Sequence, residues 1–156
     1  MDSRPADGAA APPATGAPHR RTEELGADEA LRLLGTVPLG RIVFTRHALP
    51  AVRPVNHVLD GGDIIVRVQD GSTVSALLAA QDGAGVVVAY EADAIDPATR
   101  LGWSVVATGY ADAVTDPTDL DRYARLLQPW ADAPPSRAVR IRPGVVTGFR
   151  LRADAP

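Results

Sequence analysis

The sequence contains neither cysteine nor lysine, and each absence excludes a class of chemistry. A chain without cysteine forms no disulfide, no thiolate metal site and no redox-active thiol, which suits a reducing cytoplasm. A chain without lysine cannot hold pyridoxal phosphate as a Schiff base, and it cannot build the phosphate loop of a P-loop nucleotidase. All 16 basic residues are therefore arginine, a bias that genomic base composition explains.

Strong net charge and long apolar runs are also missing. The formal net charge is −3, without the clustered basic residues that mark a nucleic-acid-binding domain. The longest apolar run, at residues 86–90, is far shorter than the roughly 18 residues that a membrane-spanning helix needs. We therefore expect a cytoplasmic protein with neither nucleic acid nor membrane as a partner.

The chain divides into a tail and one domain. Residues 1–21 consist mainly of Ala, Pro, Gly and charged residues without periodicity, so they bury too little apolar surface to offset the entropy of ordering. We predict a disordered tail there. Residues 22–156 have the length of a single domain with its own core.

Residues 53–73, RPVNHVLDGGDIIVRVQDGST, form the most informative segment. Alternation of side chains predicts a strand on each side of the DGGD turn at 60–63, whose residues tolerate a positive φ. The DGST sequence at 70–73 predicts an N-cap and the start of a short helix. A helix N-terminus presents free N–H groups and partial positive charge, and Arg67 lies just before it. The segment therefore predicts a cradle for a phosphorylated planar ligand.

The remaining pattern indicates a mainly β protein with short helices, of the α+β class. Helices are predicted at residues 27–34 and after Asp116, which is placed to act as an N-cap. The other expected strands are 40–45, 85–90 with both faces covered, 103–114 bent at Gly109, and 139–142 and 145–151 with a turn or bulge at Pro143-Gly144. About six strands without βα alternation favour an antiparallel barrel.

Few other residues indicate a site. The GWSVV sequence at 102–106 lacks the final glycine of a nucleophile elbow, and GAG at 83–85 lacks the third glycine of a dinucleotide motif. Glu91 and Asp93 are too few oxygen ligands for a cation, so we expect no metal site. His57 is the best candidate for an acid or base, because the ordinary pKa of histidine lies near neutrality.

Aromatic residues make up only 4% of the chain, so its two tryptophans stand out. We expect Trp130, beside Pro129, to pack in the core or in a subunit interface. Trp103 begins a predicted strand, where it would pack in the core or border a ligand site.

The order of these segments resembles the pyridoxamine 5'-phosphate oxidase-like family of flavin-binding split barrels, over residues 25–151. The segments that carry the resemblance are GRIVF at 40–44, PVNH at 54–57, IVR at 65–67, GS at 71–72, YEAD at 90–93, GWSV at 102–105, TGYA at 108–111 and PW at 129–130. The resemblance implies a six-stranded antiparallel split β-barrel. It also implies a homodimer with FMN at the interface, the flavin ring along the hairpin and the phosphate near the helix start.

Carried over by position, the resemblance implies nine cofactor-binding residues. The ring and ribityl chain would be lined by Pro54, Val55, Asn56 and His57. The phosphate would be held by Arg67, Val68, Ser72 and Thr73, and Trp103 would approach from the partner subunit.

Two of these positions depart from the family. Members often have threonine at the position of Val68 and lysine at that of Thr73. A charge-assisted hydrogen bond to a buried anion contributes about 1.5 to 3 kcal/mol, so we expect FMN to bind roughly tenfold to a hundredfold more weakly.

The implied activity is that of a flavin-dependent oxidoreductase acting on an unknown small molecule. The alternatives are a non-catalytic protein that binds or senses a flavin, a deazaflavin or haem, and a barrel that serves only as a dimeric interaction module.

Overall fold

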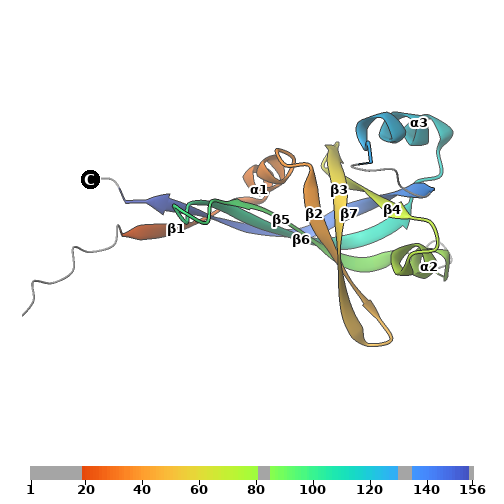
Figure 1. Ribbon diagram of the computed structural model, residues 1–156, viewed down its shortest axis with the longest axis horizontal. Coiled ribbons are helices and arrows are strands. Elements are labelled where there is room, and N and C mark those ends of the chain that lie inside the picture. Colours follow the sequence, from red (N-terminus) through yellow and green to blue (C-terminus); the bar gives the residue numbers. More distant parts are fainter. Residues whose placement is uncertain (1–18, 81–84, 130–134, 155–156) are drawn as a thin grey trace, which may run out of the picture.

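The computed structural model describes residues 19–80, 85–129 and 135–154, which contain seven strands and three helices (Figure 1). The strands are β1 (Arg20–Glu24), β2 (Leu39–Arg46), β3 (Leu49–Asp60), β4 (Asp63–Gln69), β5 (Val86–Ile95), β6 (Gly102–Ala113) and β7 (Ser136–Ala153). The helices are α1 (Ala27–Leu34), α2 (Thr73–Ala80) and α3 (Pro117–Leu126). No helix within these ranges has the length and apolar character that crossing a bilayer requires.

The strands form one antiparallel sheet in the order β1-β7-β4-β3-β2-β5-β6, and β6 also pairs with β7. Strands β2 to β7 therefore close into a barrel-like ring, and β1 adds to β7 outside it. The predicted fold class, a mainly β protein with six antiparallel strands in the ring and three short helices, is confirmed. Figure 1 shows α2 and α3 at the end of the ring where β4 finishes, away from β1.

Alternating side chains divide between two hydrophobic clusters. Ile64, Val66 and Val68 of β4 point into the ring and join its main core, against which α1 packs Leu33 and Leu34. The intervening Ile65 of β4 instead packs with Tyr123 and Leu127 and so fixes α3 to the outside of the ring. Successive residues of a strand point to opposite faces, so β4 serves both clusters.

Three local features predicted from the sequence are found in the structure. Gly61 and Gly62 have φ of 57° and 87°, as the two-residue turn between Asp60 and Asp63 requires. Asp116 accepts a hydrogen bond from the N–H of Thr118 at 3.0 Å and caps α3. The register of β6 against β7 shifts at Gly109, which confirms the predicted bend.

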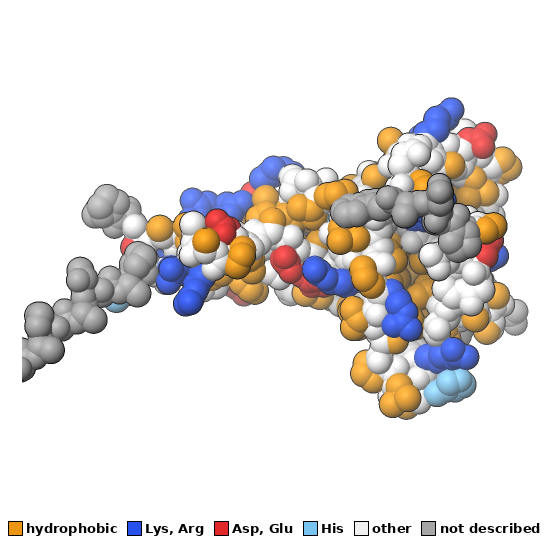
Figure 2. Space-filling view, in the orientation of Figure 1, with side chains coloured by type: hydrophobic (Ala, Val, Ile, Leu, Met, Phe, Trp, Pro, Cys, Tyr) orange, Lys and Arg blue, Asp and Glu red, His pale blue; other side chains and the backbone are white. Residues whose placement is uncertain are grey.

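The β2–β3 hairpin projects from the body of the molecule, with hydrophobic and basic side chains exposed near its end (Figures 1 and 2). Its turn residues His47 and Ala48 have φ of 50° and 62°, a conformation that non-glycine residues adopt at some cost. Leu49 and Val52 are 70% and 52% exposed.

Three expectations need correction. Arg20 and Arg21, assigned to the tail, lie in β1 because the RRTEE backbone pairs with β7; residues 1–18 of the tail fall outside the described ranges. Of the turn or bulge predicted at Pro143-Gly144, the structure shows the bulge. β7 continues through Pro143, which lies opposite Gly109 at the shift in strand register. Val87 is 58% exposed, so β5 is not covered on both faces.

Candidate functional site

A gap opens where β3 and β4 stop pairing. The two strands are hydrogen-bonded only from His57 opposite Val66 to the hairpin turn. Beyond that point β3 continues paired with β2, and β4 continues paired with β7. Among the described residues, the facing edges of β3 at 53–56 and of β4 at 67–69 thus have no partner strand, and their edge-directed backbone groups are available to a ligand.

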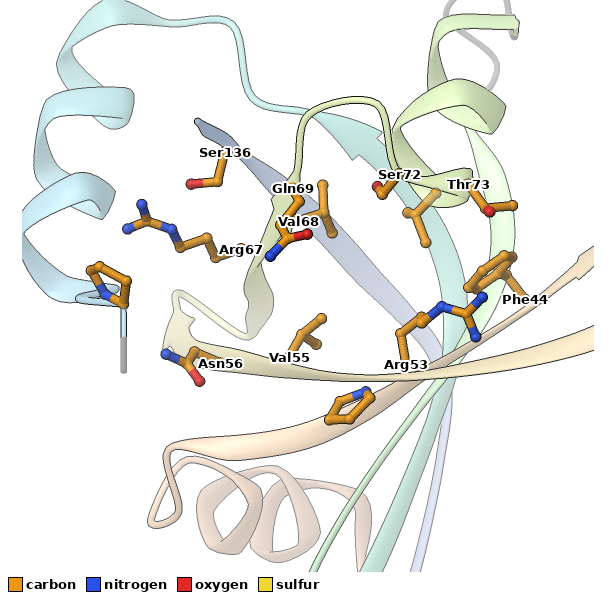
Figure 3. Close-up of a pocket in the computed structure, with 13 residues that line it drawn as sticks. Phe44, Arg53, Val55, Asn56, Arg67, Val68, Gln69, Ser72, Thr73 and Ser136 are labelled. Carbon is orange, nitrogen blue, oxygen red and sulfur yellow. The ribbon is translucent and has the colours of Figure 1, made fainter. Parts of the chain in front are cut away.

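A cavity of about 340 Å³ occupies this gap (Figure 3). We call it the split pocket. It is lined by Phe44, Arg53, Pro54, Val55, Asn56, Arg67, Val68, Gln69, Ser72, Thr73, Val74, Pro129 and Ser136. Among the described residues, its lining contains two arginines and no carboxylate, in a chain whose net charge is −3. Volume and mixed lining are those of a small-molecule site with a preference for anions.

The structure brings together most of the predicted cofactor-binding residues. Those that line the split pocket are Pro54, Val55, Asn56, Arg67, Val68, Ser72 and Thr73. His57 and Trp103 do not line it.

The N-terminus of α2 opens onto the pocket. Ser72 caps the helix, because its Oγ accepts a hydrogen bond from the N–H of Ser75 at 3.2 Å. The carbonyl of Ser72 accepts from Ala76 N–H, whereas the N–H groups of Thr73 and Val74 have no hydrogen-bond partner among the described residues. Two free N–H groups, two hydroxyls and the helix dipole therefore converge on one end of the pocket.

The two pocket arginines extend in opposite directions. In Figure 3, Arg53 extends toward the side on which Thr73 and Phe44 lie, whereas Arg67 extends away from Ser72 and Thr73. Arg67 Nη1 donates a hydrogen bond to the carbonyl of Leu127 at 2.7 Å. The cation on the helix-start side is Arg53. Arg67 instead points to the α3 face of β4, an orientation that does not favour its predicted contact with the phosphate, and that contact stays a prediction.

Asn56 makes a matching contact. Its Nδ2 donates to the carbonyl of Gln128 at 3.0 Å, next to the carbonyl that Arg67 holds. Asn56 and Arg67 together fix the segment after α3, and this segment supplies Pro129 to the pocket wall.

His57 is buried beneath the pocket and not exposed in it. Its side chain is 3% exposed, Nε2–H donates to the carbonyl of Leu34 at 2.8 Å, and Nδ1 accepts from the hydroxyl of Tyr90. Burial lowers the pKa of His57, and this effect is larger than the rise in pKa caused by the hydrogen bond to Leu34. Burial also raises the pKa of Tyr90 and keeps it a donor. His57 is thus a neutral structural residue and not an acid or base of the site.

Trp103 does not line the pocket of its own chain. Trp103 is 8% exposed and belongs to the main core, opposite Ala94 of β5. Its approach to a partner's cofactor stays a prediction. Trp130 lies outside the described residues.

Several pocket residues were missed by sequence reasoning. Arg53 is the most important, and its spacing from Val55 puts both residues on the same face of the strand. Gln69 lies within the 53–73 segment and Val74 directly after it, but neither was predicted to bind a ligand, and Phe44 and Ser136 lie outside that segment.

A second cavity of about 540 Å³ lies between α3 and the ends of β4, β6 and β7. We call it the α3 cavity. It shares Arg67 and Ser136 with the split pocket. Its other lining residues are Asp70, Ala113, Val114, Thr115, Leu120, Asp121, Tyr123, Ala124, Leu127, Arg137 and Ala138.

Comparisons with known proteins agree with this architecture. The family model described as pyridoxamine 5'-phosphate oxidase matches residues 26–150. The uncharacterized protein Rv0080 of Mycobacterium tuberculosis is 52% identical over 136 residues, which cover 87% of this chain and 90% of that protein.

Two solved structures are also similar. A FAD binding protein from Mycobacterium smegmatis is 32% identical, with a TM-score of 0.62 and coverage of 84% of this chain and 98% of that one. A candidate pyridoxamine 5'-phosphate oxidase from Corynebacterium glutamicum is 30% identical, with a TM-score of 0.67 and coverage of 86% and 100%.

Proposed function

The chain belongs to the pyridoxamine 5'-phosphate oxidase family, and we propose that it is a cytoplasmic flavoprotein that binds FMN in the split pocket. The observation that carries the proposal is the pairing of two features in one cavity. Anion-binding groups gather at the start of α2, and unpaired strand edges run beside them. The anion-binding groups suit a phosphate, and the unpaired strand edges suit a planar heterocycle with its own hydrogen-bond donors and acceptors.

The phosphate end is built from α2 and Arg53. The N–H groups of Thr73 and Val74 point out of the first turn, and the hydroxyls of Ser72 and Thr73 lie beside them. Arg53 supplies a positive charge on the same side of the pocket. None of the described lining residues carries a negative charge that would oppose an anion.

The ring end is built from β3 and β4. Val55 and Val68 offer apolar surface, and the free backbone edges offer N–H and C=O groups to the polar rim of a flavin. Val68 is 4% exposed and packs in the main core, so it stabilises the ring of strands. A threonine at this position would offer the flavin a hydrogen-bond donor, which valine lacks. We therefore keep the expectation of an FMN affinity below that of typical members.

Bound flavin would supply hydride or electron transfer. The chain's own residues would orient the flavin and exclude water from it. The lining of the split pocket contains no His, Asp, Glu, Tyr or Cys, so no described lining side chain is suited to proton transfer. This composition favours two readings, an oxidoreductase whose substrate needs no protein acid or base, and a flavin-binding protein without turnover.

Flavin binding is tested by titration of the purified protein with FMN, FAD and riboflavin, followed by flavin fluorescence. FAD is included because the M. smegmatis relative binds it. We expect saturable quenching with FMN and weaker binding of riboflavin, which lacks the phosphate. No quenching with any flavin would contradict the proposal.

Turnover is a separate question. Anaerobic photoreduction of the flavin-loaded protein, followed by mixing with candidate acceptors, distinguishes the two readings. An oxidoreductase reoxidises at a rate that depends on the acceptor, whereas a binding protein shows the same slow rate with each.

We further propose a homodimer. One face of β5, β6 and β7 exposes a group of large apolar side chains, Val87, Val106, Tyr110, Val145 and Phe149. The strand register places all five on the same side of the sheet. Exposed apolar faces of this kind are typical of subunit interfaces. Analytical ultracentrifugation should give a dimer for the wild type and a monomer for Tyr110→Asp, and a monomeric wild type would contradict this.

A further inference from the structure

We propose that the α3 cavity binds a second small ligand, a monocarboxylate with a compact apolar body, and that Arg67 holds its carboxylate. The proposal rests on flavin binding in the split pocket, because a ligand in the α3 cavity would lie beside the ring end of that pocket. It assigns to Arg67 a role other than contact with the flavin phosphate.

Arg67 lies at the junction of the two cavities. It lines both of them, as does Ser136, and Figure 3 shows its guanidinium between α3 and Ser136. The proposed phosphate position is at the opposite side of the split pocket, near Thr73. A flavin that extends from there along β3 toward Asn56 would end next to Arg67.

No described residue compensates the charge of Arg67. Its one observed hydrogen bond goes to the neutral carbonyl of Leu127, and it forms no ion pair with a carboxylate of a described residue. Arg137, which lines the same cavity, pairs with Asp70 at 2.7 Å. A half-buried guanidinium that has no counter-charge among the described residues has several N–H donors left for an anion and favours a planar carboxylate.

The remaining wall limits the ligand to one negative charge. Apolar surface in the cavity is contributed by Ala113, Val114, Leu120, Ala124, Leu127 and Ala138. Asp121 lines the cavity from the exposed side of α3 and would repel a second anionic group. Such a site fits a small aromatic or aliphatic carboxylic acid and disfavours a nucleotide or another polyanion.

The test uses benzoate as the probe and benzamide as its uncharged isostere. Isothermal titration calorimetry of the FMN-loaded wild type should show benzoate binding at least tenfold tighter than benzamide. Benzoate should also perturb the flavin absorbance, because the two sites adjoin.

Three variants locate the charge. Arg67→Met should weaken benzoate binding at least tenfold, leave benzamide affinity unchanged and leave the ratio of FMN to riboflavin affinity within threefold of the wild type. Arg67→Lys should recover part of the benzoate affinity. Arg125→Met removes the same charge from the exposed face of α3, outside both cavities, and should leave benzoate affinity within twofold of the wild type.

Equal affinity for benzoate and benzamide would overturn the proposal, as would Arg67→Met binding benzoate like the wild type. A fall of tenfold or more in the ratio of FMN to riboflavin affinity in Arg67→Met would also overturn it, because Arg67 would then contact the flavin phosphate. If the wild type binds no flavin, the proposed function fails instead, and calorimetry on the flavin-free protein still tests the α3 cavity. If Arg67→Met does not fold, the wild-type preference and the Arg67→Lys variant decide the question.

Discussion

Replacement of Arg53 by methionine should weaken FMN binding and leave riboflavin binding unchanged. Arg53 is the cation on the helix-start side of the split pocket, and riboflavin differs from FMN only by the phosphate that this cation would contact. The side chain is exposed, and its one recorded hydrogen bond goes to its own neighbour's carbonyl, at Val52. The substitution should therefore not disturb the fold.

The size of the effect follows from the exposure of Arg53. A hydrogen bond to a charged group contributes about 1.5 to 3 kcal/mol when sheltered, but solvent screens an exposed pair. We expect the lower end of that range, or about a tenfold rise in the FMN dissociation constant. The effect should shrink in about 1 M salt, where the Debye length falls to roughly 3 Å.

Quenching of flavin fluorescence measures both dissociation constants in the wild type, Arg53→Met and Arg67→Met. The ratio of FMN to riboflavin affinity should fall only in Arg53→Met. A fall in Arg67→Met with no change in Arg53→Met would refute the placement of the phosphate derived from Figure 3. An equal loss of affinity for FMN and riboflavin in Arg53→Met would show that Arg53 contacts the flavin ring.

Three further predictions concern the framework of the site. A Cβ at Gly40 would meet the hydroxyl of Tyr90 and lie 2.6 Å from the carbonyl oxygen of Glu91. Gly40→Ala should therefore lower the free energy of unfolding, measured in urea, by about 1 to 3 kcal/mol. Unchanged stability would contradict this packing. Hydrogen bonds from Arg122 and Tyr123 lower the pKa of Asp60 to about 2, so its stabilising effect is present above about pH 4 and is lost as the pH falls through 2. The difference in Tm between the wild type and Asp60→Asn should accordingly shrink between these pH values, and a constant difference would be inconsistent with it. Ala48→Gly should raise Tm, because glycine adopts the φ of 62° about 1 kcal/mol more easily, and a lower Tm would argue against this turn.

Local signals made much of the fold predictable. The DGGD turn, the Asp116 cap and the bend at Gly109 each depend on a few neighbouring residues, and each is found where the sequence places it. β1 was missed because RRTEE has no apolar face, and only its backbone pairing with β7 makes it a strand. The exposure of Val87 was missed because an apolar run does not reveal which face has a covering layer.

The site was predictable as a set of residues but not as a geometry. The hairpin and the helix start identified Val55, Ser72 and Thr73 correctly as neighbours in one cavity. The sequence did not show that Arg53, and not Arg67, extends toward Thr73, because this depends on where β3 and β4 separate. The point of separation is set by their different partner strands and leaves no mark in either strand. His57 is neutral and buried because Tyr90, distant in sequence, meets it inside the ring.

The measurement that tests the central claim most directly is titration of the purified wild-type protein with FMN and riboflavin, followed by flavin fluorescence and by the absorbance spectrum of the bound flavin. The account predicts saturable binding of one FMN per chain, with FMN binding more tightly than riboflavin and the preference decreasing in salt. Absence of flavin binding, or equal affinity for the two flavins, would contradict the assignment of the split pocket and of the α2 N-terminus as its phosphate end.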